Sequence, residues 1–244
     1  MITDIVTVAW KELREMLILG DPRGRSKFSL LIVIGVFGVF IPLQNGTDWV
    51  TSPISIAVWG WMPFIWVSSI VADSFAGERE RHTLESLLAT RLSDRAILFG
   101  KLLASLVYGV VMTWTILLVS LVTINIGFGR DGLILFPSEV MIGAFVFSIL
   151  ISGLSASVGV LVSLHAGSVR QAQQWMSAGM LVIFLPFMLV RYIPQEWLGL
   201  VDSVLVNAGP LSIGIGLAVL LFVVEMILIA VAMRRFQRSK LILD

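Results

Sequence analysis

Residues 97–126 read ILFGKLLASLVYGVVMTWTILLVSLVTINI, a run in which Lys101 is the only charged side chain. A helix needs about 20 mostly apolar residues to cross the hydrocarbon core of a bilayer. This run is longer, so the sequence predicts a transmembrane helix that is tilted or extends beyond the bilayer. The whole chain agrees with this interpretation. Of its 244 residues, 57% are hydrophobic and 14% are charged, whereas soluble domains carry about 25% charged residues.

Five further segments are similarly apolar, namely 28–43, 53–71, 140–164, 175–190 and 210–233. The segments 28–43 and 175–190 are short for a span. Because every backbone polar group inside a bilayer must be bonded within the protein, all six segments are predicted to be helices. The expected fold is therefore an all-α integral membrane domain over residues 1–244 with six transmembrane helices. The polar stretch 191–209 is expected to form an external or re-entrant segment.

The positive charges predict an orientation. If both termini are cytoplasmic, only Arg130 and Arg191 of the 17 Lys and Arg residues lie outside, and the other 15 lie inside. Cytoplasmic loops of membrane proteins carry such an excess of Lys and Arg. We therefore expect a multi-pass protein of the plasma membrane with both termini in the cytoplasm.

Residues 2–20 precede the first apolar segment and are predicted to form an amphipathic helix on the cytoplasmic interface, with Trp10 at the headgroup level. Apolar side chains recur at helical spacing on one face, at Ile2, Val6, Ala9, Leu13 and Leu17. The other face is expected to carry Asp4, Lys11, Glu12 and Glu15. A soluble helix packed on a partner protein is the alternative.

The loop between the second and third spans is the most informative polar segment. Residues 72–101 read ADSFAGERERHTLESLLATRLSDRAILFGK. Leu84, Leu87 and Leu88 follow helical spacing, and Ser93 is a candidate N-cap for the third span. A short amphipathic helix between two spans is suited to a groove of a cytoplasmic partner. A solvated, weakly paired surface is the alternative for Glu78, Arg79 and Glu80.

This loop resembles the ABC-2 type permease family, in which the corresponding loop runs approximately FAGEREKGTLELLLATPVSRxEILLGK. The matching residues are Phe75, Ala76, Gly77, Glu78, Arg79, Glu80, Thr83, Leu84, Glu85, Leu87, Leu88, Ala89, Thr90, Ser93, Ile97, Leu98, Gly100 and Lys101. The resemblance implies the six-span permease fold of type V exporters. It also implies that residues 77–92 form a coupling helix that docks on an ABC ATPase subunit. The residues expected to couple are Gly77, Glu78, Arg79, Glu80, Thr83, Leu84, Leu87 and Leu88.

Two residues depart from the family pattern. His82 occupies a position that is usually Gly, and we expect it to straighten the turn into the helix. Arg91 occupies a position that is often Pro, which would loosen the end of that helix.

Several side chains inside the predicted spans are candidates for function. In related permeases the second and fifth spans line the translocation path. The candidate lining residues in these two spans are therefore Trp59, Phe64, Trp66 and Phe184. For the tryptophans, the alternative is an aromatic belt at the membrane surface. Glu225 is the one carboxylate well inside a span and is a functional candidate by default. A protonated or hydrogen-bonded glutamate is the alternative there.

Lys101 is expected to extend its ammonium to the headgroups. Small residues of the fourth span, such as Ser152, Ala156, Gly159 and Ser163, predict close helix packing.

Sequence motifs for catalysis are missing. The chain has no G-x-x-x-x-G-K-[ST] motif to bind ATP phosphates, no H-E-x-x-H motif and no cysteine, so neither an ATPase, a zinc protease nor a thiolate metal site is predicted. The resemblance implies a non-enzymatic permease subunit that exports a substrate, binds no cofactor itself and works with ATP and Mg²⁺ on a partner ATPase. The other expected partners are a second permease copy, identical or paralogous, and membrane lipid; no nucleic acid is expected. A membrane scaffold or sensor with the same fold is the alternative function.

Overall fold

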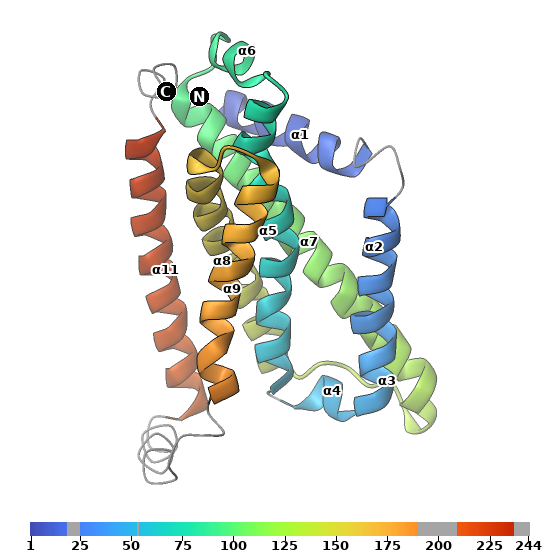
Figure 1. The fold of residues 1–244 in the computed structure, drawn as a ribbon. Coiled ribbons are helices and arrows are strands. Elements are labelled where there is room, and N and C mark those ends of the chain that lie inside the picture. Colours follow the sequence, from blue (N-terminus) through green and yellow to red (C-terminus); the bar gives the residue numbers. More distant parts are fainter. Residues whose placement is uncertain (19–24, 53, 190–208, 237–244) are drawn as a thin grey trace.

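The computed structural model describes residues 1–18, 25–52, 54–189 and 209–236, and the regular structure within these ranges is helical (Figure 1). The α-helices are α1 (Ile2–Ile18), α2 (Arg25–Ile34), α3 (Ile41–Asn45), α4 (Asp48–Thr51), α5 (Ile54–Glu80), α6 (Leu84–Leu88), α7 (Asp94–Phe128), α8 (Ser138–His165), α9 (Val169–Leu189) and α11 (Pro210–Arg235). A π-helical segment, η1 (Gly35–Phe40), joins α2 to α3, and a 3₁₀ turn, η2 (Gly129–Asp131), follows α7. The predicted external or re-entrant segment 191–209 lies almost entirely outside the described residues.

Three described helices are long and apolar enough to cross a membrane: α7, α8 and α11 from Leu211 onwards. With a rise of about 1.5 Å per residue, the 35 residues of α7 extend for about 52 Å, which exceeds the hydrocarbon thickness of about 30 Å. Figure 1 shows α7 crossing the bundle obliquely between α8 and α2. The chain is therefore a multi-pass integral membrane protein.

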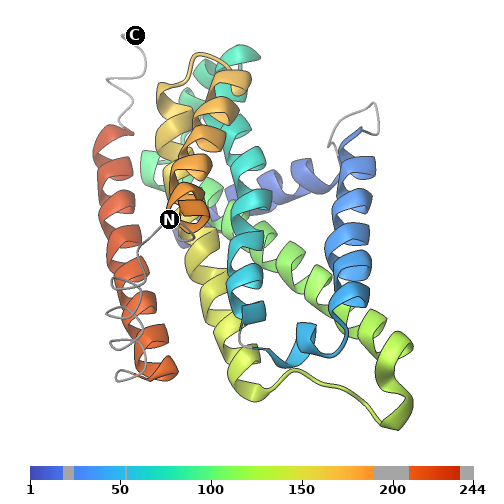
Figure 2. The same ribbon diagram turned by 60° about the horizontal axis from the view of Figure 1, so that its bottom comes forward.

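The other apolar segments of the sequence also lie on helices. The first predicted segment falls within the uninterrupted series α2, η1 and α3, and the fifth lies mostly in α9. Both helical stretches extend further than the hydropathy predicted, because polar residues such as those at 169–174 continue the helix beyond its apolar part. In both views, α2 and α11 lie at opposite edges of the bundle (Figure 2).

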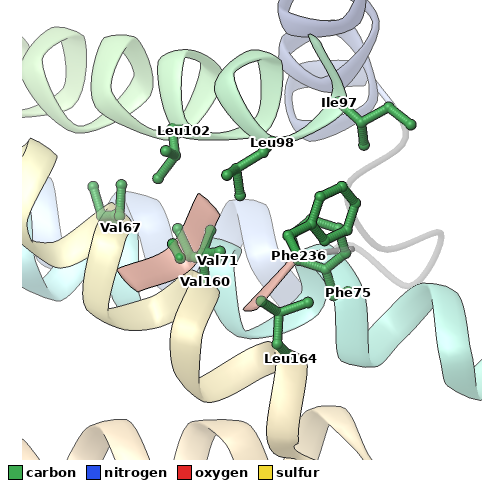
Figure 3. Close-up of a cluster of buried hydrophobic side chains, with 11 residues drawn as sticks. Val67, Val71, Phe75, Ile97, Leu98, Leu102, Val160, Leu164 and Phe236 are labelled. Atoms are coloured by element: carbon green, nitrogen blue, oxygen red, sulfur yellow. The ribbon is translucent and has the colours of Figure 1, made fainter. Parts of the chain in front are cut away.

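Close helix packing at small residues is confirmed for α8. Ser152, Ala156 and Ser163 are almost completely buried. A Cβ added at Gly159 would lie 2.7 Å from Cγ1 of Val71 on α5, so only a glycine allows α5 to approach α8 at this level. A first hydrophobic cluster therefore forms where α5, α7, α8 and α11 meet. Its buried members are Val67, Val71, Phe75, Ile97, Leu98, Leu102, Ala156, Val160, Leu164, Ala232 and Phe236 (Figure 3).

The N-terminal helix α1 packs on α7 through a face that the sequence did not predict. Val8, Ala9 and Glu12 are buried, whereas Ile2 and Trp10 are 76% and 69% exposed. The predicted placement of Glu12 on the outer polar face is therefore wrong. Because an ammonium group lies buried beneath α1, this helix turns a carboxylate towards the protein.

Candidate functional site

The candidate site is the polar region between the second and third predicted spans, where α5 ends and α6 and α7 follow. We call it the helix junction and define it as residues 73–83 together with Glu12, Gly100, Lys101, Ser163 and Val169. In Figure 1, α6, α1 and the turn between α8 and α9 all lie at this end of the bundle. Each charged side chain from Glu78 to Arg81 contacts a different part of the molecule.

Lys101 lies at the centre of the helix junction. Its Nζ donates hydrogen bonds to Oε1 of Glu12 at 2.9 Å, Oε1 of Glu78 at 2.8 Å and the carbonyl oxygen of Ser74 at 2.9 Å. These three bonds use every donor of an ammonium group, and the side chain is 2% exposed. The expectation that Lys101 extends to the headgroups is therefore wrong. Lys101 instead joins α1, α5 and α7.

The charges at this centre are unequal, because two carboxylates face one buried ammonium. Lys11 contributes a second cation from the surface, with its Nζ 3.9 Å from Oε1 of Glu12. Oε2 of Glu78 is buried and has no hydrogen-bond partner among the described residues. Burial raises the pKa of the Glu78 carboxyl, although the nearby Lys101 ammonium acts in the opposite direction.

Gly100 explains why α1 can approach α7 so closely. A Cβ at this position would lie 2.6 Å from Cβ of Val8 and 3.2 Å from the carbonyl oxygen of Ile5. Any larger residue would separate α1 from α7. The pair Gly100–Lys101, noted above as part of the family pattern, thus combines a close contact with a buried ion pair.

Arg79 and Glu80 hold the turn between α8 and α9. The guanidinium of Arg79 donates to the carbonyl oxygens of Ala166 at 2.7 Å and Leu164 at 3.0 Å, at the C-terminal end of α8. Oε2 of Glu80 accepts a hydrogen bond from the backbone N–H of Val169, where α9 begins. A cation at a helix C-terminus and an anion at a helix N-terminus are both favourable. For Arg79, the alternative of a weakly paired solvated side chain is therefore wrong.

Ser163 of α8 makes a second link to α5. Its Oγ accepts hydrogen bonds from the backbone N–H groups of Phe75 and Ala76 and donates one to the carbonyl oxygen of Ala72. A side chain that inserts into the backbone bonds of a neighbouring helix is a recognised cause of local bending. Sequence reasoning assigned Ser163 only to packing, because its small size gave no sign of these bonds.

Gly77 is buried beneath a salt bridge between Asp73 and Arg81. These side chains stand four residues before and after Gly77, and their charged atoms meet at 3.2 Å. A Cβ at Gly77 would lie 2.6 Å from Cγ of Asp73. Only a glycine therefore leaves room for the bridge on this face of α5.

The turn after α5 is made by His82, which has φ +56°. The backbone keeps the left-handed conformation that suits the glycine common at this position in the family. The expectation that His82 straightens the turn is therefore wrong. Thr83 follows, and its Oγ1 donates to the carbonyl oxygen of Glu78 at 3.3 Å.

Replacing His82 by Gly is expected to raise the free energy of unfolding by up to about 1 kcal/mol, because left-handed backbone strains a residue with a Cβ. Ala89→Gly is the matched control, since Ala89 is exposed nearby but has φ −75°, and there glycine should destabilise. Thermal unfolding of the purified variants measures both effects. A lower Tm for His82→Gly than for the wild type would contradict this interpretation.

The predicted coupling helix 77–92 is divided in the structure. Its first residues belong to α5, and only Leu84–Leu88 form α6. Leu87 is partly buried and packs against the first cluster, whereas Glu85, Ser86 and Ala89 are exposed. The side chains of Leu84 and Leu88 lie outside the described part of the structure.

The candidate translocation residues whose side chains the structure describes are not part of the helix junction. Trp66 is 8% exposed and belongs to a second hydrophobic cluster with Trp49, Met62 and Ile116. Phe64 is 5% exposed. The side chains of Trp59 and Phe184 lie outside the described residues, and Glu225 lies on α11. Their role in a translocation path stays a prediction.

Comparison with known proteins adds independent findings. Residues 39–233 match the family model described as ABC-2 family transporter protein. The chain is also similar to the ABC transporter permease protein NatB of Bacillus subtilis (strain 168), with 33% identity over 137 residues. That alignment covers 51% of this chain and 34% of NatB, so the chain matches about a third of the relative's length.

Proposed function

Because the chain belongs to the ABC-2 family of transporter proteins, we propose that it is the permease subunit of an ABC exporter. ATP would be hydrolysed on a separate ABC ATPase subunit. Two permease copies, identical or paralogous, would enclose one pathway across the plasma membrane. The family match at residues 39–233 supports this proposal, since it contains most of the helix junction and the apolar helices.

The proposed topology has six spans, formed by α2–η1–α3, α5, α7, α8, α9 and α11, within a single permease domain over residues 1–244. The cytoplasmic side would be the end with α6, because the topology predicted from the sequence assigns 15 of the 17 Lys and Arg residues to that side. In this orientation α1 lies along the cytoplasmic interface, where the exposed Ile2 and Trp10 would meet the lipid headgroups.

The observation that carries the proposal is the way the helix junction joins several helices to the C-terminal end of α5, which leads into α6. Glu78 connects this end of α5 to Lys101 of α7 and, through Lys101, to Glu12 of α1. Arg79 and Glu80 connect it to α8 and α9. An ATPase subunit that docks on the exposed side of α6 would therefore act through α5 on α1, α7, α8 and α9 at once. ATP-driven closure of two ATPase subunits would reach the spans by this route.

Leu84→Asp is expected to abolish co-purification of the ATPase subunit while membrane insertion is unchanged, because a charge in the apolar stripe of α6 opposes docking in an apolar groove. Leu84 is preferred to Leu87, whose partial burial would mix docking with folding. Leu133→Asp is the matched control, since Leu133 is 77% exposed in the connection at the other end of the bundle.

Affinity purification of the permease from membranes, followed by quantification of the ATPase subunit, measures the effect. Equal ATPase recovery for Leu84→Asp and Leu133→Asp would refute docking at α6. Normal recovery of the ATPase with the wild type but no substrate transport in reconstituted vesicles would favour a scaffold or sensor.

A further inference from the structure

Glu225 stands apart from the helix junction and from the proposed coupling route. It lies on α11, which is mostly exposed apolar surface, yet Glu225 itself is 8% exposed. Arg234, the nearest basic residue of the described part of α11, is nine positions further along, or about 14 Å at 1.5 Å per residue. Glu225 is fifteen positions from the first residue of α11, so its carboxyl lies far from both ends of this apolar helix.

The carboxyl group lies against the backbone of α8 at Gly153. A Cβ added to Gly153 would be 2.7 Å from Cδ of Glu225 and 3.1 Å from its Oε2. The carboxyl group itself, and not its CH₂ stem, therefore occupies the space that the missing side chain leaves. Any other residue at position 153 would displace it.

The contact between α8 and α11 continues from Gly153 and Glu225 towards the C-terminal ends of both helices. On α11, Ile229 and Ala232 follow Glu225 on the same face, and Phe236 comes directly after the helix. On α8, Ala156, Val160 and Leu164 follow Gly153. These residues pack together in the first cluster (Figure 3). The Glu225 carboxyl is thus the polar end of an otherwise apolar seam that holds α11 on α8.

No cation of the described helices faces this carboxyl. Glu139 and His165 are the titratable residues of α8 and lie at its two ends, about 21 and 18 Å from Gly153 along the helix. Residues 54–72 of α5 and 102–128 of α7 contain one titratable side chain, Tyr108, and α9 carries only Arg170, in its first turn. Lys101 is already bound to Glu12 and Glu78.

We propose that Glu225 is a reversible proton-binding site in the bilayer, at the contact between α8 and α11. A carboxylate without a cation or water is strongly disfavoured at such depth, so the closed seam holds the neutral acid. Release of the proton to water leaves a carboxylate that must be hydrated. Deprotonation therefore requires the seam to open at Gly153, and proton binding closes it again.

Carbodiimide labelling tests the proposal on the full-length permease in membranes, without the ATPase subunit. A protonated carboxyl adds across a C=N bond of dicyclohexylcarbodiimide, its proton passes to nitrogen, and the product rearranges to a stable N-acylurea. We expect this apolar reagent to label the peptide with Glu225, and the labelling to fall as the pH rises, because only the protonated carboxyl reacts. Glu225→Gln should abolish the label.

A water-soluble carbodiimide should label exposed carboxyls such as Glu139 and leave Glu225 unlabelled. Gly153→Ala should displace the carboxyl and make Glu225 accessible to that reagent. Gly216→Ala is the matched control, because a Cβ at Gly216 meets nothing within 4 Å, and it should leave the labelling unchanged.

Absence of apolar labelling at every pH, or equal labelling of Glu225 by both reagents in the wild type, would overturn the proposal. The result is independent of the proposed function, because failure of ATPase docking at α6 would not change the labelling of α11.

Discussion

Lys101→Met is expected to lower the Tm of the purified permease by about 10 °C. The change removes the ammonium and leaves the carboxylates of Glu12 and Glu78 facing one another, with side chains only 10% and 11% exposed. Removing one partner of a buried ion pair typically costs about 3–5 kcal/mol, because a charge is left buried without compensation. A loss of that size corresponds to a Tm shift of roughly 10 °C in a domain of this length. Thermal unfolding in detergent, followed by the fluorescence of the eight tryptophans, provides the measurement.

Two further variants separate the buried pair from general effects of charge. Lys11→Met removes a cation from the same neighbourhood, but the Lys11 side chain is 54% exposed, so its Tm should be close to that of the wild type. The triple variant Lys101→Met, Glu12→Gln, Glu78→Gln contains no buried charge and should recover part of the loss. Equal Tm values for Lys101→Met and Lys11→Met would show that the buried contacts of Lys101 do not form.

Arg79→Met is expected to release the turn between α8 and α9 from α5. The variant loses two charge-assisted hydrogen bonds to the carbonyl oxygens of Leu164 and Ala166, each worth about 1.5–3 kcal/mol. Amide hydrogen exchange in residues 164–172 should therefore become faster, while the ATPase subunit should still co-purify. Under the proposed function, substrate transport should fall more than ATPase recovery, because docking at α6 persists but its connection to α8 is lost.

Arg81→Met is the control for this variant. Arg81 is two positions away and bonds to Asp73, but both side chains are about half exposed, and such surface pairs contribute little. Exchange in residues 164–172 should be unchanged in Arg81→Met. If the two variants exchange at the same rate, Arg79 does not hold the turn.

The sequence predicted the helices well because hydropathy reports directly on residues that avoid water. The described part of each predicted apolar segment lies on a helix. Ser93 caps α7 as expected, with its Oγ accepting from the N–H of Ala96 at 3.2 Å. Hydropathy does not report what a segment packs against. The outer face predicted for Glu12 was therefore wrong, because amphipathic spacing cannot distinguish a face that meets lipid from one that meets protein.

The contacts of the helix junction could not be predicted from local sequence patterns. Lys101 and Glu12 are 89 positions apart, and Ser163 is 88 positions from Phe75. Periodicity within one segment contains no information about such partners. The resemblance to the ABC-2 family did mark Glu78 and Arg79 as coupling residues and Lys101 as a matching position, but it did not indicate which side chains they bind. The left-handed backbone of His82 could have been expected from the glycine common at this position in the family, since glycine is the residue that adopts positive φ most readily.

The insertion of Ser163 into α5 has a consequence for the kind of motion that this end of the molecule permits. The hydroxyl is bonded to three backbone groups of α5, at Ala72, Phe75 and Ala76, so α5 cannot rotate about its own axis at this level unless those bonds break. A torque applied to α6 should therefore not be absorbed as a twist of α5. We expect α5 and α8 to translate as a pair. The ends of both helices on the far side of the membrane should then move by nearly the same distance as the ends near α6.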